Sequence, residues 1–297
     1  MRTELKLALA AALVVAIAAP ALANDEAGKL GPQLTWDAAR DGSPRSYMLN
    51  GIKLTFTSAK DADKNIIPVL TLNAPGVAPV AVKGQSGFDH AIASFGVAKI
   101  DPKNSGLQVI FTSYSGGAHC CTNVLVLEAV NGEWKTIDLG SWDGEGLAGI
   151  PRDEDGDGTA DLVFYDNAFL YTFDSYAGSW APPLIMNVVD GKATNVSTAP
   201  RYIPLYRADM EKAKAECAKH ANGACAAYVA EAARIGEFDL GWAFMLANYD
   251  PKSDWDYPGR CDGKVVDYVC KGTTIKSKNY PESLHWFLED NGYIKKP

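Results

Sequence analysis

The pattern of hydrophobic and polar residues divides the chain into a β-rich part and a helical part. Between about Tyr47 and Ser197, short runs rich in β-branched and aromatic residues alternate with turn residues. Asn-Gly and Asp-Gly pairs at 131–132 and 190–191 add turn signals of the kind found in antiparallel hairpins. The runs that predict strands are 52–57, 109–112, 124–129, 162–165 and 184–188.

Beyond Pro204 the residues change to strong helix formers. Helices are expected over 207–221, 224–234, 238–248 and 282–290, with glycines at the breaks between them. We therefore expect a mainly β fold, with antiparallel sheets arranged as propeller-like blades or as a sandwich. A small α-helical C-terminal domain is expected to follow it.

Residues 1–23 have the layout of a secretory signal peptide. A charged start precedes an uncharged run from Leu7 to Ala19 and an Ala-x-Ala ending at Ala23. The uncharged run is shorter than the roughly 20 residues that a bilayer requires. We expect cleavage after Ala23, a periplasmic or secreted protein, and no membrane span. The expected domains are then 24–200, which is β-rich, and 201–297, which is helical.

The composition excludes two classes of protein. The 297 residues include 28 Lys and Arg against 36 Asp and Glu, a net charge of −8, and 47% are hydrophobic. This apolar content is too high for a disordered chain. The acidic balance argues against a nucleic-acid partner, because binding to phosphates needs a basic face.

Export also changes the meaning of the cysteines. Six cysteines in an oxidising compartment predict disulfides, with 15 pairings in principle. Local spacing favours Cys217 with Cys225, across the Asn222-Gly223 turn, and Cys261 with Cys270. The adjacent residues at 120 and 121 are then left to each other. An exchange that joins one of these two to the C-terminal half stays open.

The strongest chemical signal is the acidic segment 153–161. Asp153, Asp155 and Asp157 alternate, Thr159 occupies a position that usually offers its carbonyl, and Asp161 closes the set. Calcium takes six to eight oxygen ligands, and an Asp-x-Asp-x-Asp-Gly segment can wrap them around one ion. The segment lacks the terminal Glu of an EF-hand and precedes a predicted strand, so we expect a Ca²⁺ loop of another kind.

This segment resembles a known family. Residues 148–163 are similar to the FG-GAP/VCBS-type repeat, in which a calcium loop precedes a strand of a propeller blade. Residues 93–101 resemble a second copy without the carboxylates, and the resemblance covers about Phe95 to Ser197. It implies calcium-ligand roles for the residues named above. The stretch is too short for a closed propeller of six or seven blades, and the helical part resembles no family that we recognise.

A second unusual segment, 115–122, reads Ser-Gly-Gly-Ala-His-Cys-Cys-Thr. Three interpretations compete for it: a structural disulfide, a metal site that uses His119, or a nucleophilic Cys121 activated by His119. A closed zinc site needs four ligands, and activation of a thiol needs a third group to orient the histidine. The structural disulfide is favoured, because an exported chain oxidises its cysteines.

These observations favour a function in binding. We expect an exported calcium-binding β protein that acts as an interaction module for an unknown protein or polysaccharide. Aromatic residues between Trp134 and Trp180 could stack on sugar rings, although aromatic residues more often fill a core. The alternative is an exported enzyme, either a hydrolase with clustered carboxylates or a thiol-active protein using His119, Cys120 and Cys121. No catalytic motif assigns catalytic residues.

Overall fold

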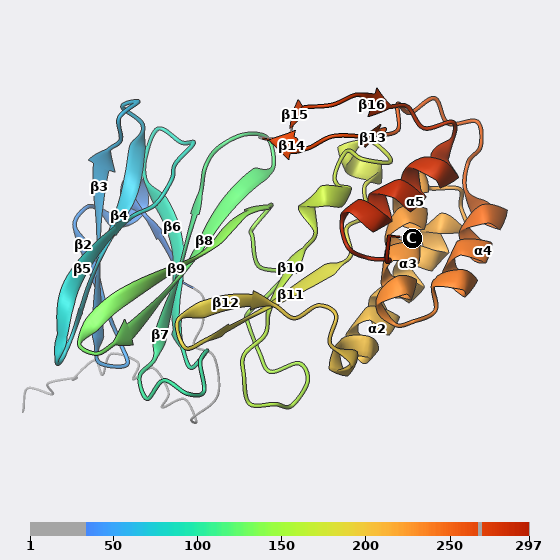
Figure 1. Ribbon diagram of the computed structural model, residues 1–297. Coiled ribbons are helices and arrows are strands. Elements are labelled where there is room, and N and C mark those ends of the chain that lie inside the picture. The colour runs from blue at the N-terminus through green and yellow to red at the C-terminus, as the bar shows by residue number, and fades with distance from the viewer. Residues whose placement is uncertain (1–33, 267–268, 297) are drawn as a thin grey trace, which may run out of the picture.

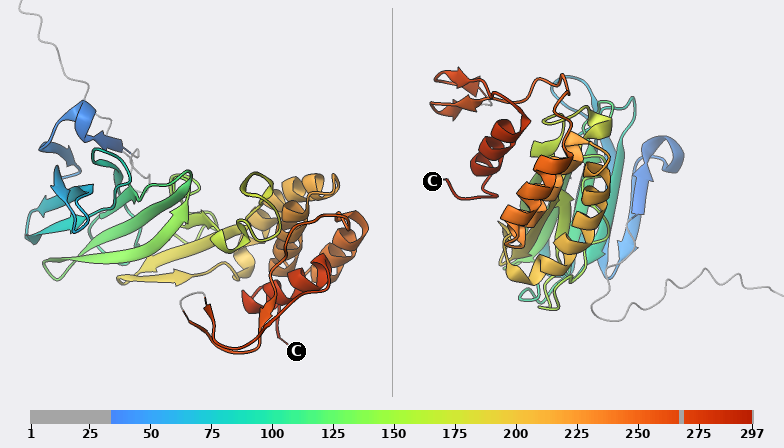
Figure 2. Two further views of the ribbon diagram at one scale, coloured as in Figure 1. Left: turned by 90° about the horizontal axis from the view of Figure 1, so that it is seen from above. Right: turned by 90° about the vertical axis from the view of Figure 1, so that its right-hand side faces the viewer.

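The computed structural model describes residues 34–296 except 267–268. The predicted signal peptide, 1–23, lies outside the described residues. Figure 1 shows three layers of sheet followed by helices, and Figure 2 shows that the layers and helices follow one another along an elongated molecule. None of the helices in the described part of the chain is long and apolar enough to cross a membrane.

Two antiparallel sheets form the N-terminal part. The outer sheet has the order β2-β3-β4-β5, and the central sheet has the order β1-β6-β7-β8-β9. The outer strands are β2 (Arg45–Leu49), β3 (Ile52–Lys60), β4 (Ile66–Ala74) and β5 (Val77–Lys83). The central strands are β1 (Leu34–Asp37), β6 (Ile92–Ala98), β7 (Gln108–Tyr114), β8 (Cys120–Val130) and β9 (Glu133–Asp143), and the short helix α1 (Ala38–Asp41) follows β1.

An aromatic core joins the two sheets. Phe56 of the outer sheet lies with its ring centroid 4.6 Å from that of Phe95 and 5.2 Å from that of Trp36, both in the central sheet. All three side chains are fully buried. Burial of such large apolar surfaces is the main favourable contribution to folding, so this interface makes the two sheets a sandwich.

The central sheet is buried on both faces. On its second face, Ile110 and Val126 pack against Leu162 and Phe164 of a third sheet. This sheet consists of β10 (Leu162–Tyr165), β11 (Pro183–Val189) and β12 (Lys192–Asn195). A strand covered on both faces needs apolar residues at successive positions, which explains the continuous apolar runs in β7 and β8.

The helical part packs on the far side of the third sheet. Ile185 of β11 is buried against Tyr202 and Tyr206. The helices are α2 (Ile203–Cys217), α3 (Asn222–Arg234), α4 (Phe238–Asn248) and α5 (Tyr280–Asp290), and the 3-10 turns are η1 (Asn167–Phe169), η2 (Tyr176–Gly178) and η3 (Pro200–Tyr202). Phe169 and Phe173, from the segment after β10, enter the core of the helical part. The two parts of the chain therefore share buried side chains.

A ribbon of short strands lies between α4 and α5. It consists of β13 (Arg260–Cys261), β14 (Val265–Val266), β15 (Val269–Cys270) and β16 (Thr274–Ile275). β13 pairs with β16, and β14 pairs with β15. The runs that predict strands do not include this ribbon, nor β1, β2, β4, β5 and β6.

The expected fold class is confirmed. The chain is mainly β, its sheets are antiparallel, and a smaller helical region follows. The arrangement is a stack of open sheets, and among the described strands no barrel or propeller closes. All five predicted strand segments lie within observed strands, and the four predicted helices correspond to α2 to α5.

Candidate functional site

The acidic loop joins β9 to β10 and is closed by an antiparallel bridge between Arg152 and Asp161. The Asp161 N–H donates to the Arg152 carbonyl at 2.9 Å. Gly156 and Gly158, which lie between Arg152 and Asp161, have φ angles of 80° and 85°. A side chain is disfavoured in that conformation, so these two glycines allow the loop to fold back on itself.

Three of the five predicted ligands converge. Carboxylate oxygens of Asp153, Asp155 and Asp161 lie within 4.8 Å of one another. Two oxygens that bind one calcium ion at about 2.3–2.6 Å lie at most about 5 Å apart, so this spacing allows a shared ion. All the donors are hard carboxylate oxygens, the type that calcium prefers. The three carboxylates therefore fit part of the oxygen-ligand set that a calcium ion takes.

The other two predicted ligands make different contacts. Asp157 Oδ1 accepts the Thr159 N–H at 2.7 Å, and Asp157 Oδ2 lies 3.4 Å from Arg201 Nη2. Arg201 Nε also pairs with Asp155 Oδ2. A guanidinium group thus rests on two carboxylates of the loop, where it partly balances their charge. The sequence pattern alone did not reveal Arg201, because it lies beyond the third sheet.

Asp161 connects the loop to the start of the helical part. Its side chain accepts hydrogen bonds from the Tyr202 hydroxyl at 2.6 Å, Asn187 Nδ2 at 2.7 Å and the Glu154 N–H at 2.8 Å. Burial raises the pKa of Asp161, although these three donors act in the opposite direction. Tyr202 belongs to η3, so the loop is held against the turn that leads into α2.

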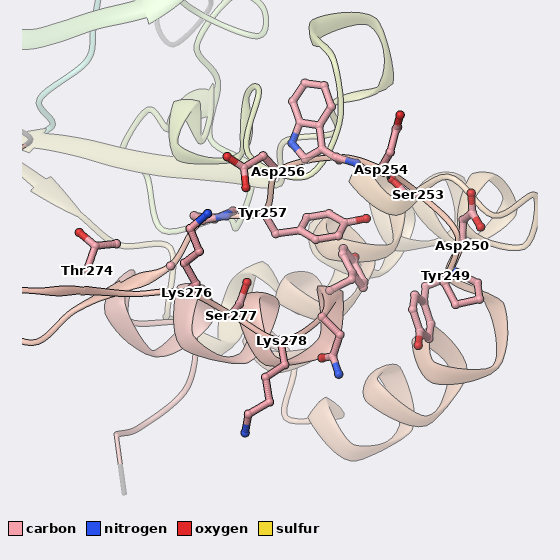
Figure 3. Close-up of a pocket in the computed structure, with 16 residues that line it drawn as sticks. Tyr249, Asp250, Ser253, Asp254, Asp256, Tyr257, Thr274, Lys276, Ser277 and Lys278 are labelled. Carbon is pink, nitrogen blue, oxygen red and sulfur yellow. Dashed lines mark hydrogen bonds between the residues drawn. The ribbon is translucent and has the colours of Figure 1, made fainter.

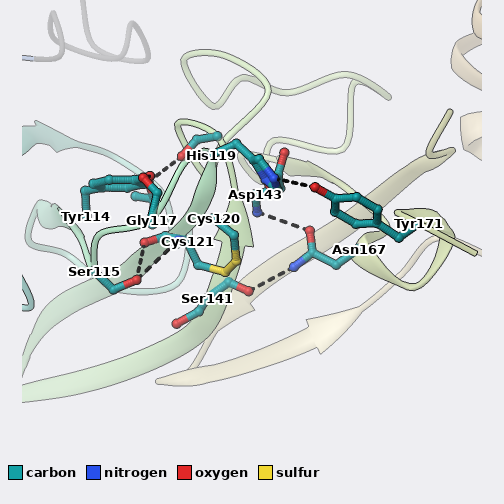
Figure 4. Close-up of a disulfide and its surroundings, with 12 residues drawn as sticks. Tyr114, Ser115, Gly117, His119, Cys120, Cys121, Ser141, Asp143, Asn167 and Tyr171 are labelled. Carbon is teal, nitrogen blue, oxygen red and sulfur yellow. Dashed lines mark hydrogen bonds and ion pairs between the residues drawn. A yellow bond between two sulfur atoms is a disulfide. The ribbon is translucent and has the colours of Figure 1, made fainter. Parts of the chain in front are cut away.

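The adjacent cysteines lie at a second polar cluster (Figure 4). Cys120 and Cys121 form a disulfide with each other at the first two positions of β8. Cys120 is paired with Asp143, the last residue of β9. The long β8–β9 hairpin therefore brings its two ends together, and His119 Nδ1 lies 2.9 Å from Asp143 Oδ1.

Two tyrosines from the segment after β10 complete this cluster. The Tyr171 hydroxyl lies 2.8 Å from His119 Nε2, and the Tyr176 ring stacks on the imidazole with centroids 3.6 Å apart. The Tyr176 hydroxyl donates to Asp143 Oδ2 at 2.5 Å, and this bond, together with burial, raises the pKa of Tyr176 to about 12. Both imidazole nitrogens are thus hydrogen-bonded, and the group that orients His119 is Asp143.

The remaining cysteines pair as local spacing favoured. Cys217 at the end of α2 is bonded to Cys225 in α3, and both are fully buried. Cys261 and Cys270 join β13 to β15. The structure therefore contains no exchange between the adjacent pair and the C-terminal half, and all six cysteines are oxidised.

A groove lies between the third sheet and α2, next to the acidic loop. We call it the β10–α2 groove. It consists of a cavity of about 980 Å³ and an adjoining cavity of about 300 Å³, and Tyr165, Asp209 and Lys212 line both. The larger cavity also includes loop residues such as Asp153 and Asp161, and the smaller one includes Asp143 and Trp180.

The aromatic residues that the sequence singled out divide into two groups. Trp142 stacks on Phe164 with centroids 4.2 Å apart and belongs to the core. Trp180 lines the groove, and Tyr165 there is 48% exposed. Tyr171, beside the disulfide, is 52% exposed. Trp142 thus fills the core, and Trp180, Tyr165 and Tyr171 are the rings that remain accessible to a ligand.

A further cavity of about 500 Å³ lies in the helical part, between the loop that follows α4 and the start of α5 (Figure 3). The hydroxyl of Tyr257 accepts a hydrogen bond from Asn222 Nδ2 at 2.6 Å, and the hydroxyl of Tyr280 donates to the Asn222 carbonyl at 2.7 Å. Tyr257 thus attaches the loop to α3, and Tyr280 attaches the start of α5 to it, which are structural roles.

The fold and the loop define a layered β protein with a candidate cation site and a disulfide-linked helical part. A family model described as the sll0997 C-terminal domain matches residues 205–292, which include α2 to α5. The chain is 37% identical to the probable thylakoid lumen protein sll0997 of Synechocystis over 246 residues, 79% of this chain and 70% of that protein. The chain therefore belongs to the sll0997 family.

A second relative is longer. The chain is 30% identical to the uncharacterized protein y4bJ of Sinorhizobium fredii over 271 residues, which is 89% of this chain but 42% of that protein. The chain thus spans less than half the length of this relative. No solved structure matches the chain.

Proposed function

We propose that the protein is an exported, calcium-stabilised β protein that acts as a binding module for a protein or polysaccharide partner outside the cytoplasm. The observation that carries the calcium part is the convergence of Asp153, Asp155 and Asp161 on one point. A bound ion would neutralise these carboxylates and hold the loop against β10. The β10–α2 groove offers the surface for a partner.

Two further observations support export. The relative from Synechocystis is named a probable thylakoid lumen protein, which places that protein beyond a membrane. The present chain has three disulfides, a feature of oxidising compartments. Together with the predicted signal peptide, these observations favour the periplasm or the exterior of the cell.

Thermal unfolding with and without a chelator tests the calcium site. At a calcium concentration of about 100 times Kd, an ion that binds only the folded state stabilises it by about 2.7 kcal/mol. A change of that size raises the midpoint by roughly 5–10 °C in a chain of this size. Asp155→Ala should abolish the response. Asp63→Ala is the matched control, because Asp61 and Asp63 form an acidic turn that lacks the third carboxylate.

Two outcomes would reject the site. One is a midpoint that stays constant when calcium is chelated. The other is a calcium response that survives in Asp155→Ala and is lost in the Asp63→Ala control. Either would mean that the acidic loop is an ordinary solvated turn, with Arg201 as its counter-ion.

The enzyme alternative draws on one observation, the hydrogen-bonded series Asp143–His119–Tyr171. A carboxylate that orients a histidine beside a hydroxyl is an arrangement used in general base catalysis. The thiol version requires Cys120 and Cys121 in the reduced form. Titration of thiols in the native protein tests it: two reactive thiols would favour the thiol-active alternative, and none would favour the structural disulfide.

A further inference from the structure

We propose that the β10–α2 groove binds an oligosaccharide that carries no negative charge, with Trp180 and Tyr165 packing against sugar rings. This inference rests on the proposed binding function and assigns its ligand class. Three observations support it: the aromatic rings that line the groove, the hydrogen-bonded polar groups beside them, and the excess of carboxylates in its lining.

Two aromatic rings, Trp180 and Tyr165, are partly buried and line the groove. Trp180 packs against the cluster that contains Met210 and Ala213 and also lines the smaller cavity, so it faces both the core and the groove. Tyr165 ends β10 and is 48% exposed, although it is a large ring in the middle of the groove. Rings held by the core and open on another side offer apolar contact area at small entropic cost.

The polar groups beside these rings are held in place. Asp143 lines the smaller cavity while His119 and Tyr176 bond its two carboxylate oxygens. Asp209 lines both cavities and lies 3.1 Å from Lys212 Nζ. Carboxylates accept hydrogen bonds from hydroxyl groups and an ammonium group donates them, so the set matches a polyhydroxylated ligand. Their fixed positions reduce the entropy lost on binding.

The charge of the groove sets the ligand class. Its lining contains five carboxylates, at residues 143, 153, 154, 161 and 209, against two cations, at residues 152 and 212. With the proposed calcium ion bound to Asp153 and Asp161, the two charges of the ion change this balance from −3 to −1, which is still negative. Uronic-acid polymers and nucleic acids would meet repulsion along this surface. Neutral sugars and amino sugars would not.

Glu231 of α3 lies behind Asp209. It is fully buried, and neither carboxylate oxygen has a hydrogen-bond partner among the described residues. Burial, followed by the nearby charge of Asp209, raises the pKa of Glu231 well above its ordinary value. The negative charge of Asp209, which lines both cavities of the groove, therefore disfavours ionisation of Glu231.

Isothermal titration in calcium buffer tests the inference with three probes: cellohexaose as a neutral ligand, a glucosamine hexamer as a cationic one, and a galacturonate hexamer as an anionic one. We expect binding of at least one of the first two and none of the third. Tyr165→Ala should weaken binding by about tenfold, the size of one lost stacking contact. Trp180→Phe should weaken it less than Trp180→Ala, because the core packing is preserved.

Phe88→Ala is the matched control, because Phe88 is 43% exposed and lies outside the lining of the groove. The inference is overturned if neither the neutral nor the cationic hexamer binds, if the anionic hexamer binds equally well, or if Tyr165→Ala binds like the wild-type protein. A protein partner captured in the groove in place of a glycan would overturn it as well. If the melting midpoint still responds to calcium but no glycan binds, the proposed ligand class is rejected and the proposed calcium site is not.

Discussion

Replacing Glu231 with methionine should make the protein more stable, and the gain should grow with pH. Glu231 is fully buried in α3 and both carboxylate oxygens lack a hydrogen-bond partner among the described residues. The charged groups nearest to it are Asp209 and Lys212 of α2. Methionine has a similar length and no polar atoms, so Glu231→Met removes the buried carboxyl group with little change in volume.

The direction in which the stability changes with pH follows from the pKa of Glu231. In the unfolded chain the Glu231 carboxyl has its ordinary pKa near 4.5, and in the folded protein burial raises this pKa well above that value. The folded state therefore binds more protons across this window. The favourable contribution of Glu231 is complete below pH 4.5 and is lost as the pH rises through the folded-state pKa. In Glu231→Met this loss is absent.

The expected gain at pH 8 is about 1–3 kcal/mol, the cost of a buried polar group without a partner. In a chain of this size it corresponds to roughly 2–4 °C in the melting midpoint for each kcal/mol. At pH 4.5 the wild-type side chain is mostly protonated in the folded state, and the variant should differ much less. Urea unfolding at both pH values measures the two free energies.

Glu289 provides a matched control for this experiment. It is also buried, at 5% exposure, but it lies 2.6 Å from Arg260 Nη2. Glu289→Met leaves that guanidinium without one of its carboxylates, so it should destabilise the protein by about 1–3 kcal/mol. Equal losses of stability in both variants at pH 8 would refute the reasoning, because they would show that Glu231 is stabilised by contacts of its own.

Two further changes test other contacts. Arg201→Gln should tighten calcium binding by about tenfold, or about 1.4 kcal/mol, because the guanidinium group rests on two carboxylates of the loop. Arg152 pairs with Glu154, outside the three converging carboxylates, so Arg152→Gln should leave the calcium affinity unchanged. Calcium titration measures the affinities of the wild-type protein and the two variants, and equal values would show that Arg201 does not compete with calcium. Replacing both Cys217 and Cys225 with alanine should lower the free energy of unfolding in urea by about 2–3 kcal/mol, as expected for a disulfide that closes a loop of this length. An unchanged urea midpoint would show that packing alone holds α2 against α3.

The sequence predicts much of the fold because its signals are local. Alternation and turn residues identify β3, β7, β8, β10 and β11, helix formers identify α2 to α5, and local cysteine spacing favours the disulfides that the structure shows. The longer strands β4, β5 and β6 were not among the predicted runs. The strand β1 was missed because its four residues, Leu34–Asp37, give too little pattern. The ribbon at 260–275 was missed for the same reason, since its strands have two residues each.

The candidate sites were predictable only where one segment carries them. The acidic loop supplies Asp153, Asp155 and Asp161 from nine consecutive residues, so spacing alone indicates its chemistry. His119 could be singled out, but its partner Asp143 comes from the other end of a hairpin. The groove combines residues from the third sheet and α2, and no sequence pattern joins two surfaces that meet only after folding.

The acidic loop and the groove share residues, so a change of charge in one alters the other. Asp153 and Asp161 belong both to the converging carboxylates and to the lining of the larger cavity. Neutralising them would therefore lower the negative charge that a ligand meets in the groove. Asp161 is also bonded to Tyr202, and the neighbouring Arg201 pairs with the loop, so the same carboxylates hold the turn that begins the helical part. Since α2 forms the opposite wall of the groove, the charge of the loop and the position of that wall depend on the same contacts.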